Sequence, residues 1–224
     1  MTIAIIFFGS VAMIAAWWLT QQGIATKPWL EEGAVRELRS AGASSIPAAK
    51  IGLAVFLAVV GSLFTLFTLA YSMRMHMGDW QPLPVPTLLW LNTGVLVLSS
   101  LAMHWAQIAA GRGEAEWVKA SLLAGGGLTL AFLAGQLVAW QQLIQAGYFA
   151  ASNPANAFFY LFTAVHGLHL LGGLVALGWT TAKAWTGGRE PLELARLSVE
   201  LCAMYWHFLL LVWLVLFGLL LHHA

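Results

Sequence analysis

Residues 199–213 read VELCAMYWHFLLLVW, and they place a carboxylate and an imidazole inside an otherwise apolar run. Glu200 and His207 are seven residues apart, so a helix brings both to the same face. An ionised carboxylate in hydrocarbon costs at least a few kcal/mol, so within a membrane it must face protein, a lipid headgroup or water. The stretch therefore predicts a transmembrane helix with one polar face that meets something other than lipid tails.

The composition extends this prediction to the whole chain of 224 residues. It is 60% hydrophobic and only 8% charged, with a mean hydropathy of +0.80, which is far from a soluble domain. A bilayer core about 30 Å thick needs roughly 20 apolar residues per helix. Six runs meet this need: 2–20, 51–73, 86–109, 119–144, 156–183 and 196–221. Long continuous runs favour helices over a barrel of short alternating strands, so we predict an all-α polytopic membrane bundle of six transmembrane helices.

The distribution of positive charge predicts the orientation of these helices. Of the ten Lys and Arg residues, all but Arg74 fall in or beside the connections after the first, third and fifth runs. The positive-inside rule then puts these connections in the cytoplasm and both termini on the non-cytoplasmic side. The first run lacks a basic start and a small-residue cleavage site, so it is interpreted as a retained helix. We expect residues 1–49 to form this helix and a cytoplasmic linker, and residues 50–224 to form a five-helix core.

Charge and cysteine content exclude several functions. A formal net charge of +1, without a basic patch, gives no support for a nucleic-acid partner. The single cysteine, Cys202, allows neither a disulfide framework nor a cysteine metal site.

Small and polar residues inside the runs predict how the helices pack. Gly127, Ala131 and Gly135 recur every four residues and would form a ridge that permits close helix approach. Ser99, Ser100 and other polar residues of run 86–109 are typical of hydrogen bonds between membrane helices.

His166 and His169 are three residues apart and neighbour each other on one helix surface. Two such imidazoles can ligate a haem or copper ion. Against this reading, the other runs offer only His104 and His207 as further ligands. The alternative is that the pair hydrogen-bonds to Glu200, to a backbone carbonyl or to a lipid phosphate.

Four segments carry a resemblance to a known family. The stretches FFYLFTAVHGLHLLGGLVALGW (158–179) and ELCAMYWHFLLLVWLVLF (200–217) together resemble subunit III of the haem-copper terminal oxidases, especially the cytochrome c oxidase branch. The stretches LPVPTLLWLNTGVLVLSSLAMHWA (83–106) and LAFLAGQLVAWQQL (130–143) are also similar to bacterial subunits III. The likeness covers about residues 50–221.

The resemblance implies an accessory subunit that packs beside subunit I, with subunit II and cytochrome c as further partners. Such a subunit has no catalytic or metal-ligating residue and contributes to oxygen reduction only within the complex, where partner subunits carry haem and copper. It holds phospholipid in a cleft between helix groups and supports proton uptake, oxygen access and durability. The implied location is the bacterial cytoplasmic membrane. The residues expected at its polar cluster and lipid-facing surface are His166, His169, Glu200, Trp206 and His207.

The chain departs from the family pattern at three points. The family often has an acidic residue after a Phe-Leu-Ala-Ser run, whereas residues 56–60 read FLAVV; it often has Asp at the position of Leu210. The family also has two helices or none before the last five, and this chain has one.

Three alternatives stay open. The chain could serve a quinol oxidase or a protein related to nitric oxide reductase, or it could be a small-solute transporter that uses Glu200 and the histidines as a proton relay. No internal repeat supports a transporter. For Glu200 two roles stay open. It is either a carboxylate that takes part in lipid binding or proton transfer, or a buried acid that pairs with a histidine for packing alone.

Overall fold

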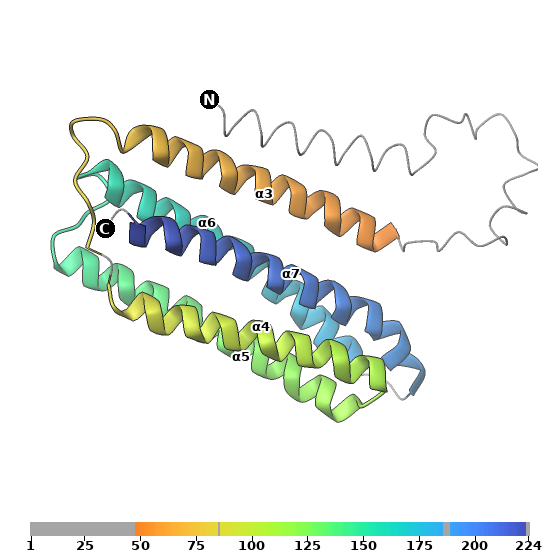
Figure 1. Ribbon diagram of the computed structural model, residues 1–224. Helices are drawn as coiled ribbons and strands as arrows, with labels where there is room; N and C mark the ends of the chain where they lie inside the picture. The colour runs from red at the N-terminus through yellow and green to blue at the C-terminus, as the bar shows by residue number, and fades with distance from the viewer. Residues whose placement is uncertain (1–47, 85, 186–188, 223–224) are drawn as a thin grey trace, which may run out of the picture. The chain divides into compact units, whose positions relative to one another are not determined.

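The computed structural model describes residues 48–84, 86–185 and 189–222, apart from the side chains of residues 48 and 189–195. The regular structure in these ranges is entirely helical (Figure 1): α3 (Ala48–Arg74), α4 (Leu88–Arg112), α5 (Ala115–Gln145), α6 (Pro154–Trp185) and α7 (Arg189–His222). The chain divides into two compact units, residues 1–48 and residues 49–224. The expected first helix, residues 2–20, lies outside the described residues.

All five helices are long and apolar enough to cross a membrane. The candidate spans are Ala49–Arg74, Leu88–Arg112, Ala115–Gln145, Pro154–Trp185 and Arg196–His222. The prediction of an all-helical, multi-pass membrane protein is confirmed for these five spans. A sixth span and the side on which the termini lie stay predictions.

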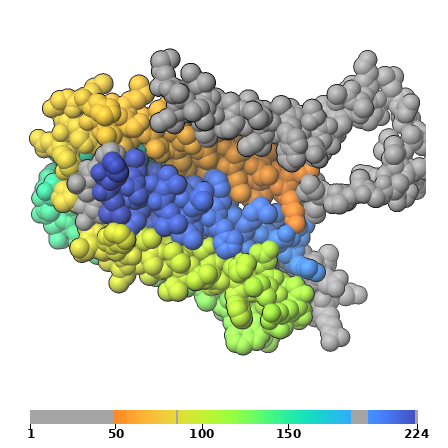
Figure 2. Space-filling view, in the orientation of Figure 1, coloured from red at the N-terminus to blue at the C-terminus, as the bar shows by residue number. Residues whose placement is uncertain are grey.

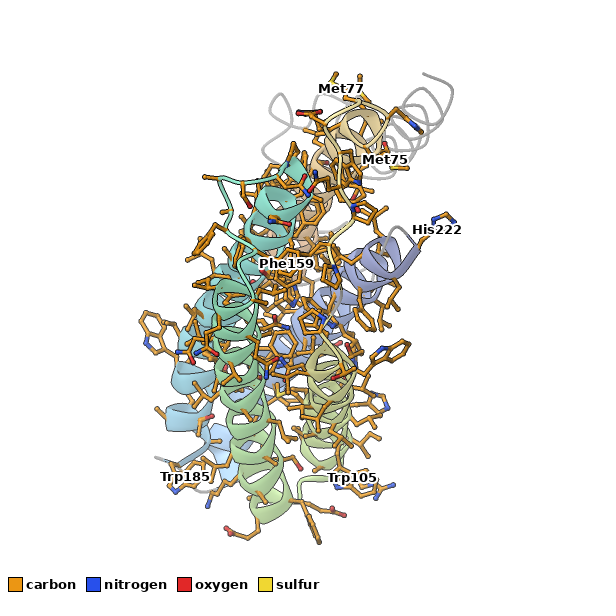
Figure 3. All side chains as sticks on the ribbon, turned by 90° about the vertical axis from the view of Figure 1, so that its left-hand side faces the viewer. Met75, Met77, Trp105, Phe159, Trp185 and His222 are labelled. Atoms are coloured by element: carbon orange, nitrogen blue, oxygen red, sulfur yellow. The ribbon has the colours of Figure 1, made fainter. Side chains whose placement is uncertain are left out.

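Successive helices run in opposite directions, so the connections gather at two ends (Figure 1). The ends of α3 and α5 lie at the same end of the bundle as the end of α7, whereas α3 and α7 begin at the other end, beside the α4–α5 turn. Figure 3 shows Trp185 at this second end and Met75, Met77 and His222 at the first. Within the described residues, positive charge therefore gathers at one end, on Lys50, Arg112, Lys119, Lys183 and Arg196.

The core is built from seams whose buried residues alternate spacings of three and four. On α5 these are Val118, Leu122, Gly125, Thr129, Phe132, Gln136, Ala139 and Leu143. On the facing side of α4 they are Leu89, Asn92, Leu96, Ser99, Met103, Ala106 and Ala110. This spacing averages 3.5 residues and is the packing pattern of helices that cross at small angles, as in coiled coils.

The predicted glycine ridge of α5 is wrong at two of its three positions. Gly127 and Ala131 are exposed, while the close approach occurs at Gly125, where an added Cβ would lie 2.8 Å from the sulfur of Met103. Steps of four residues drift by about 40° each around a helix of 3.6 residues per turn. A seam that alternates steps of three and four residues stays close to one face of the helix. The buried seam through Gly125 therefore lies on a different face from Gly127 and Ala131.

The first described helix, α3, is the least buried of the five. It packs through Val60, Phe64 and Tyr71 against Phe162 of α6 and Val212 of α7. Because α3 makes this limited contact, clefts open between it and the other helices.

Candidate functional site

Glu200 forms an ion pair with a residue 150 positions away in the sequence. The ammonium of Lys50, in the first turn of α3, donates a hydrogen bond to Glu200 Oε1 at 2.5 Å. The two side chains are 29% and 30% exposed, so the pair is half-buried. Glu200 also lines a polar pocket of about 160 Å³ with Gln107 and Arg196. Its partner is thus a lysine, and no histidine pairs with it in the described residues.

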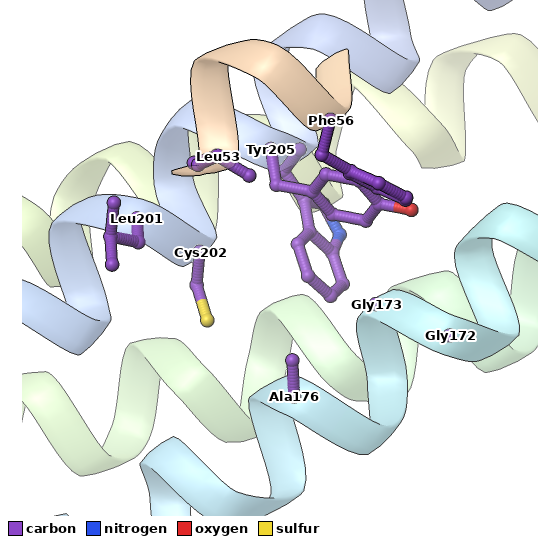
Figure 4. Close-up of a pocket in the computed structure, with 9 residues that line it drawn as sticks. Leu53, Phe56, Gly172, Gly173, Ala176, Leu201, Cys202 and Tyr205 are labelled. Atoms are coloured by element: carbon purple, nitrogen blue, oxygen red, sulfur yellow. The ribbon is translucent and has the colours of Figure 1, made fainter. Parts of the chain in front are cut away.

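An apolar cleft of about 290 Å³ begins beside this ion pair, between α3, α6 and α7. Figure 4 shows its walls, which are made by Leu53, Phe56, Gly172, Gly173, Ala176, Leu201, Cys202, Tyr205 and Trp206. Leu53 lies one turn after Lys50, and Leu201 follows Glu200 directly. The ion pair therefore stands at the charged end of an otherwise apolar cleft.

Glycine allows the close helix contact at the back of this cleft. A Cβ added at Gly173 would lie 2.6 Å from the ring of Tyr205, closer than real Cβ contacts allow. The hydroxyl of Tyr205 donates to the carbonyl oxygen of His169 at 2.8 Å and fixes the ring against α6. A second apolar cleft of about 260 Å³ lies between α3 and α7, lined in part by Gly61, Phe64 and Phe208.

Trp206 joins three helices. Only 1% of it is exposed, and its indole N–H lies 3.1 Å from Ser99 Oγ on α4 and 3.0 Å from Thr129 Oγ1 on α5. One edge of its ring borders the apolar cleft. Trp206 is therefore mainly an anchor of the helix packing, and it meets the cleft only with its ring.

The two histidines of α6 do not converge on one site. His166 is fully buried, with ring centroids 5.2 Å from Trp213, 5.9 Å from Phe132 and 6.3 Å from Phe64. Neither of its ring nitrogens has a partner among the described residues. His169 instead donates from Nδ1 to the carbonyl oxygen of Val165 at 2.7 Å, which matches the backbone alternative given above.

His207 lies in the groove between α7 and α4, beside Ser100 and His104. Its Nδ1 is 2.6 Å from Ser100 Oγ, and its ring centroid is 5.6 Å from that of His104. Among the described residues, no three His, Cys, Asp or Glu side chains group closely enough to hold a metal ion.

The five residues expected at the polar cluster and lipid-facing surface thus do not share one site. Sequence reasoning also missed several contacts of the candidate site: Lys50 at the ion pair, Thr129 as an acceptor for Trp206, and Tyr205 in the cleft wall. Thr129 lies seven residues before Gln136, the repeat of a buried helix seam, and this spacing could have identified it. Nothing local marks Lys50, because its partner is distant in the sequence.

A second ion pair joins the last residue of the first described span, Arg74, to Asp79 in the loop after α3. The two terminal NH2 groups of the Arg74 guanidinium donate to the two carboxylate oxygens of Asp79, at 2.6 and 2.5 Å. These hydrogen bonds hold the pKa of Asp79 below its usual value.

These features define a polytopic α-helical membrane protein with an apolar cleft between its helices and an ion pair at the end of that cleft. The family model described as cytochrome c oxidase subunit III matches residues 48–223, so the chain belongs to this family. The match includes all five described helices and confirms the resemblance noted in the sequence.

Curated relatives agree with the family. The chain is 32% identical over 160 residues to the probable cytochrome c oxidase subunit 3 of Mycobacterium tuberculosis, which covers 68% of this chain and 76% of the relative. It is 32% identical over 174 residues to the cytochrome c oxidase subunit 3 of Synechocystis, which covers 74% of this chain and 72% of the relative. It is 26% identical over 131 residues to the cytochrome bo(3) ubiquinol oxidase subunit 3 of Pseudomonas aeruginosa, which covers 57% of this chain and 60% of the relative. The chain is accordingly an accessory subunit III of an aerobic terminal oxidase.

Proposed function

We propose that this chain holds phospholipid in the α3–α6–α7 cleft of a proton-pumping cytochrome c oxidase. It packs beside subunit I in a bacterial cytoplasmic membrane, together with subunit II, and cytochrome c donates electrons to the complex. The chain itself carries no redox centre. It supports proton uptake, oxygen access and the durability of the complex. Residues 50–224 form its five-helix core, and residues 1–49 add the sixth span and a linker, which puts both termini on the non-cytoplasmic side.

The observation that carries the lipid proposal is the apolar cleft with Lys50 and Glu200 at its charged end. The walls offer almost only carbon atoms, which suits an acyl chain, and the volume of about 290 Å³ is close to the lower limit of ordinary ligand pockets. Lysines near the ends of membrane helices extend toward the headgroup level. An ammonium there can bind a lipid phosphate while it stays close to Glu200.

A second candidate donor is a quinol. The Pseudomonas aeruginosa relative, named as a ubiquinol oxidase subunit, favours it, whereas the relatives at 32% identity are named for cytochrome c. Membership of the oxidase family leaves no support for the transporter alternative.

The donor and partners are tested by purifying the complex through a tag on this chain in mild detergent. Haem bands in the optical spectrum, with a copper-domain subunit among the co-purifying chains, are the expected result. A colourless chain without oxidase subunits would contradict the proposal, and a haem complex without a copper domain would favour the quinol.

The lipid site is tested with two neighbouring substitutions on α6. Ala176→Trp fills the cleft, whereas Val175→Trp adds the same ring at a position 62% exposed and outside the cleft lining. Phospholipid that co-purifies with the complex, counted by mass spectrometry, should fall for Ala176→Trp alone. Equal lipid content in both variants would remove the cleft as the lipid site.

A further inference from the structure

A polar seam runs along the groove between α4 and α7. On α4, Ser100, His104 and Gln107 follow each other at spacings of four and three, so they share one helix face. Their neighbours on α7 are arranged in antiparallel order. Ser100 contacts His207 toward the middle of the spans, and Gln107 lines the polar pocket of Glu200 near the charged end.

The outer side of this groove is uncovered in the described part of the chain. Figure 2 shows α7 flanked by α3 and α4 on one face of the molecule. The helices that pack extensively against α4 are α5 and α7, and neither covers the outward side of His104. His104 and His207 are both exposed, and Leu101 beside them is 57% exposed.

The histidine pair lies at the depth of the hydrocarbon core. His207 is about 16 Å along the helix axis from Arg196 and about 22 Å from His222, the two ends of its span. His104 is about 12 Å from the charged end of α4 at Arg112. Exposed imidazoles at such depth are costly unless they face protein or water.

The hydrogen bond to Ser100 indicates which group His207 presents outward. A serine hydroxyl proton needs an acceptor, and the partner of Ser100 Oγ among the described residues is His207 Nδ1, at 2.6 Å. If Ser100 donates, the ring proton of a neutral His207 is on Nε2. The outward nitrogen is then a hydrogen-bond donor that needs an acceptor from another molecule.

We propose that the α4–α7 groove is a docking surface for a transmembrane helix of another oxidase subunit, which presents a hydrogen-bond acceptor side chain to the His104–His207 pair. The inference rests on the assignment of the chain to an oxidase complex. A lipid fits this position poorly, because its polar atoms lie at the headgroup level and its acyl chain has no acceptor at the depth of His207. A protein helix can place a carboxylate or carbonyl there, next to the exposed apolar side chains around the pair.

Photo-crosslinking in intact membranes tests the position of the partner. A photoreactive amino acid replaces Leu101 on α4 or Leu214, which shares the face of His207 and is 46% exposed. Controls replace Leu130 on α5 and Val175 on α6, which are 57% and 62% exposed on other faces. We expect both groove positions to crosslink to one membrane helix of one partner subunit, identified by mass spectrometry, and we expect the controls not to reach that helix.

The outcomes separate this inference from the family assignment. Adducts only with lipid, or only with residues 2–20 of this chain, would overturn the docking surface while co-purifying oxidase subunits still upheld the assignment. A chain without any oxidase subunit would overturn both.

Histidine variants test the acceptor. The double variant His104→Leu and His207→Leu should retain about three- to tenfold less of the crosslinked subunit during detergent washes, the range expected for loss of one or two membrane hydrogen bonds. The matched control is His76→Leu, in the loop outside the spans. His207→Gln keeps a donor and should restore most of the retention. Equal retention in all variants would show that the histidines do not hold the partner.

Discussion

The tryptophan that joins α4, α5 and α7 gives the most direct test of the fold. Trp206→Phe removes the indole N–H that lies 3.1 Å from Ser99 Oγ and 3.0 Å from Thr129 Oγ1. Both hydroxyls keep a bond to the carbonyl oxygen of Gly125, so neither is left without a partner. The substitution also removes ring atoms from a site that is only 1% exposed.

The expected magnitude follows from these two losses. A hydrogen bond between membrane helices contributes about 0.6 kcal/mol on average and at most about 1.7 kcal/mol. A small cavity in a core that cannot collapse adds about 1 kcal/mol. We therefore expect the free energy of unfolding to fall by about 2 kcal/mol, measured by titrating the detergent-solubilised protein with a denaturing detergent.

The matched control is Trp179→Phe on α6. Trp179 is 73% exposed, so the same chemical change there should alter the free energy of unfolding by less than about 0.5 kcal/mol. A double-mutant cycle of Trp206→Phe with Thr129→Val should give a coupling energy of about 0.5 to 1.5 kcal/mol. Equal effects at the two tryptophans, or no coupling to Thr129, would refute the reasoning.

Three further predictions address the cleft and the outer loop. Glu200→Ala should lower phospholipid content or assembly more than it changes single-turnover oxygen reduction, because it leaves the lysine without its partner; lipid counting and rapid kinetics check this. Gly173→Ala should destabilise the protein by about 1–3 kcal/mol, because the new Cβ would lie 2.6 Å from a tyrosine ring, whereas Gly178→Ala meets nothing within 4 Å and should not destabilise it. The pKa of Asp79 is lowered by hydrogen bonds from Arg74, so its contribution is present above the unfolded carboxyl pKa and is lost as pH falls through the lowered value. Asp79→Asn should accordingly lower the melting temperature at pH 7 and have little effect in strong acid.

The three histidines lie in different surroundings, so their spacing in the sequence did not predict a shared site. His166 is enclosed by aromatic rings, His169 bonds to its own helix, and His207 faces outward beside His104. Spacing predicted that His166 and His169 would be neighbours, and both rings lie against the ring of Phe64, with centroids 6.3 and 5.5 Å from it. It did not predict that α3, α5 and α7 would give the two rings different surroundings, because side chains three residues apart differ in direction by about 60°.

The sequence by itself determined the class of protein and most of its spans. In lipid, every backbone polar group must be satisfied within its own helix, so long apolar runs predict helices without any knowledge of tertiary contacts. Five runs are observed as helical spans whose ends lie within a few residues of the predicted ends. The grouping of cations at one end also followed from the sequence, because alternating helices bring alternate connections together. The paired motifs of α6 and α7 identified the family.

Only the tertiary structure decided the partners of the polar groups. Lys50 reaches Glu200 across 150 residues, and Thr129 receives the indole of Trp206 across 77. The predicted ridge through Gly127 and Ala131 lies on the wrong face because small residues occur on several faces of α5. The side chains of α4, such as Met103 against Gly125, determine which of these faces is packed. Periodicity fixes which residues share a face, but which face is buried depends on the neighbouring helices, because in lipid apolar side chains are equally stable against protein and against acyl chains.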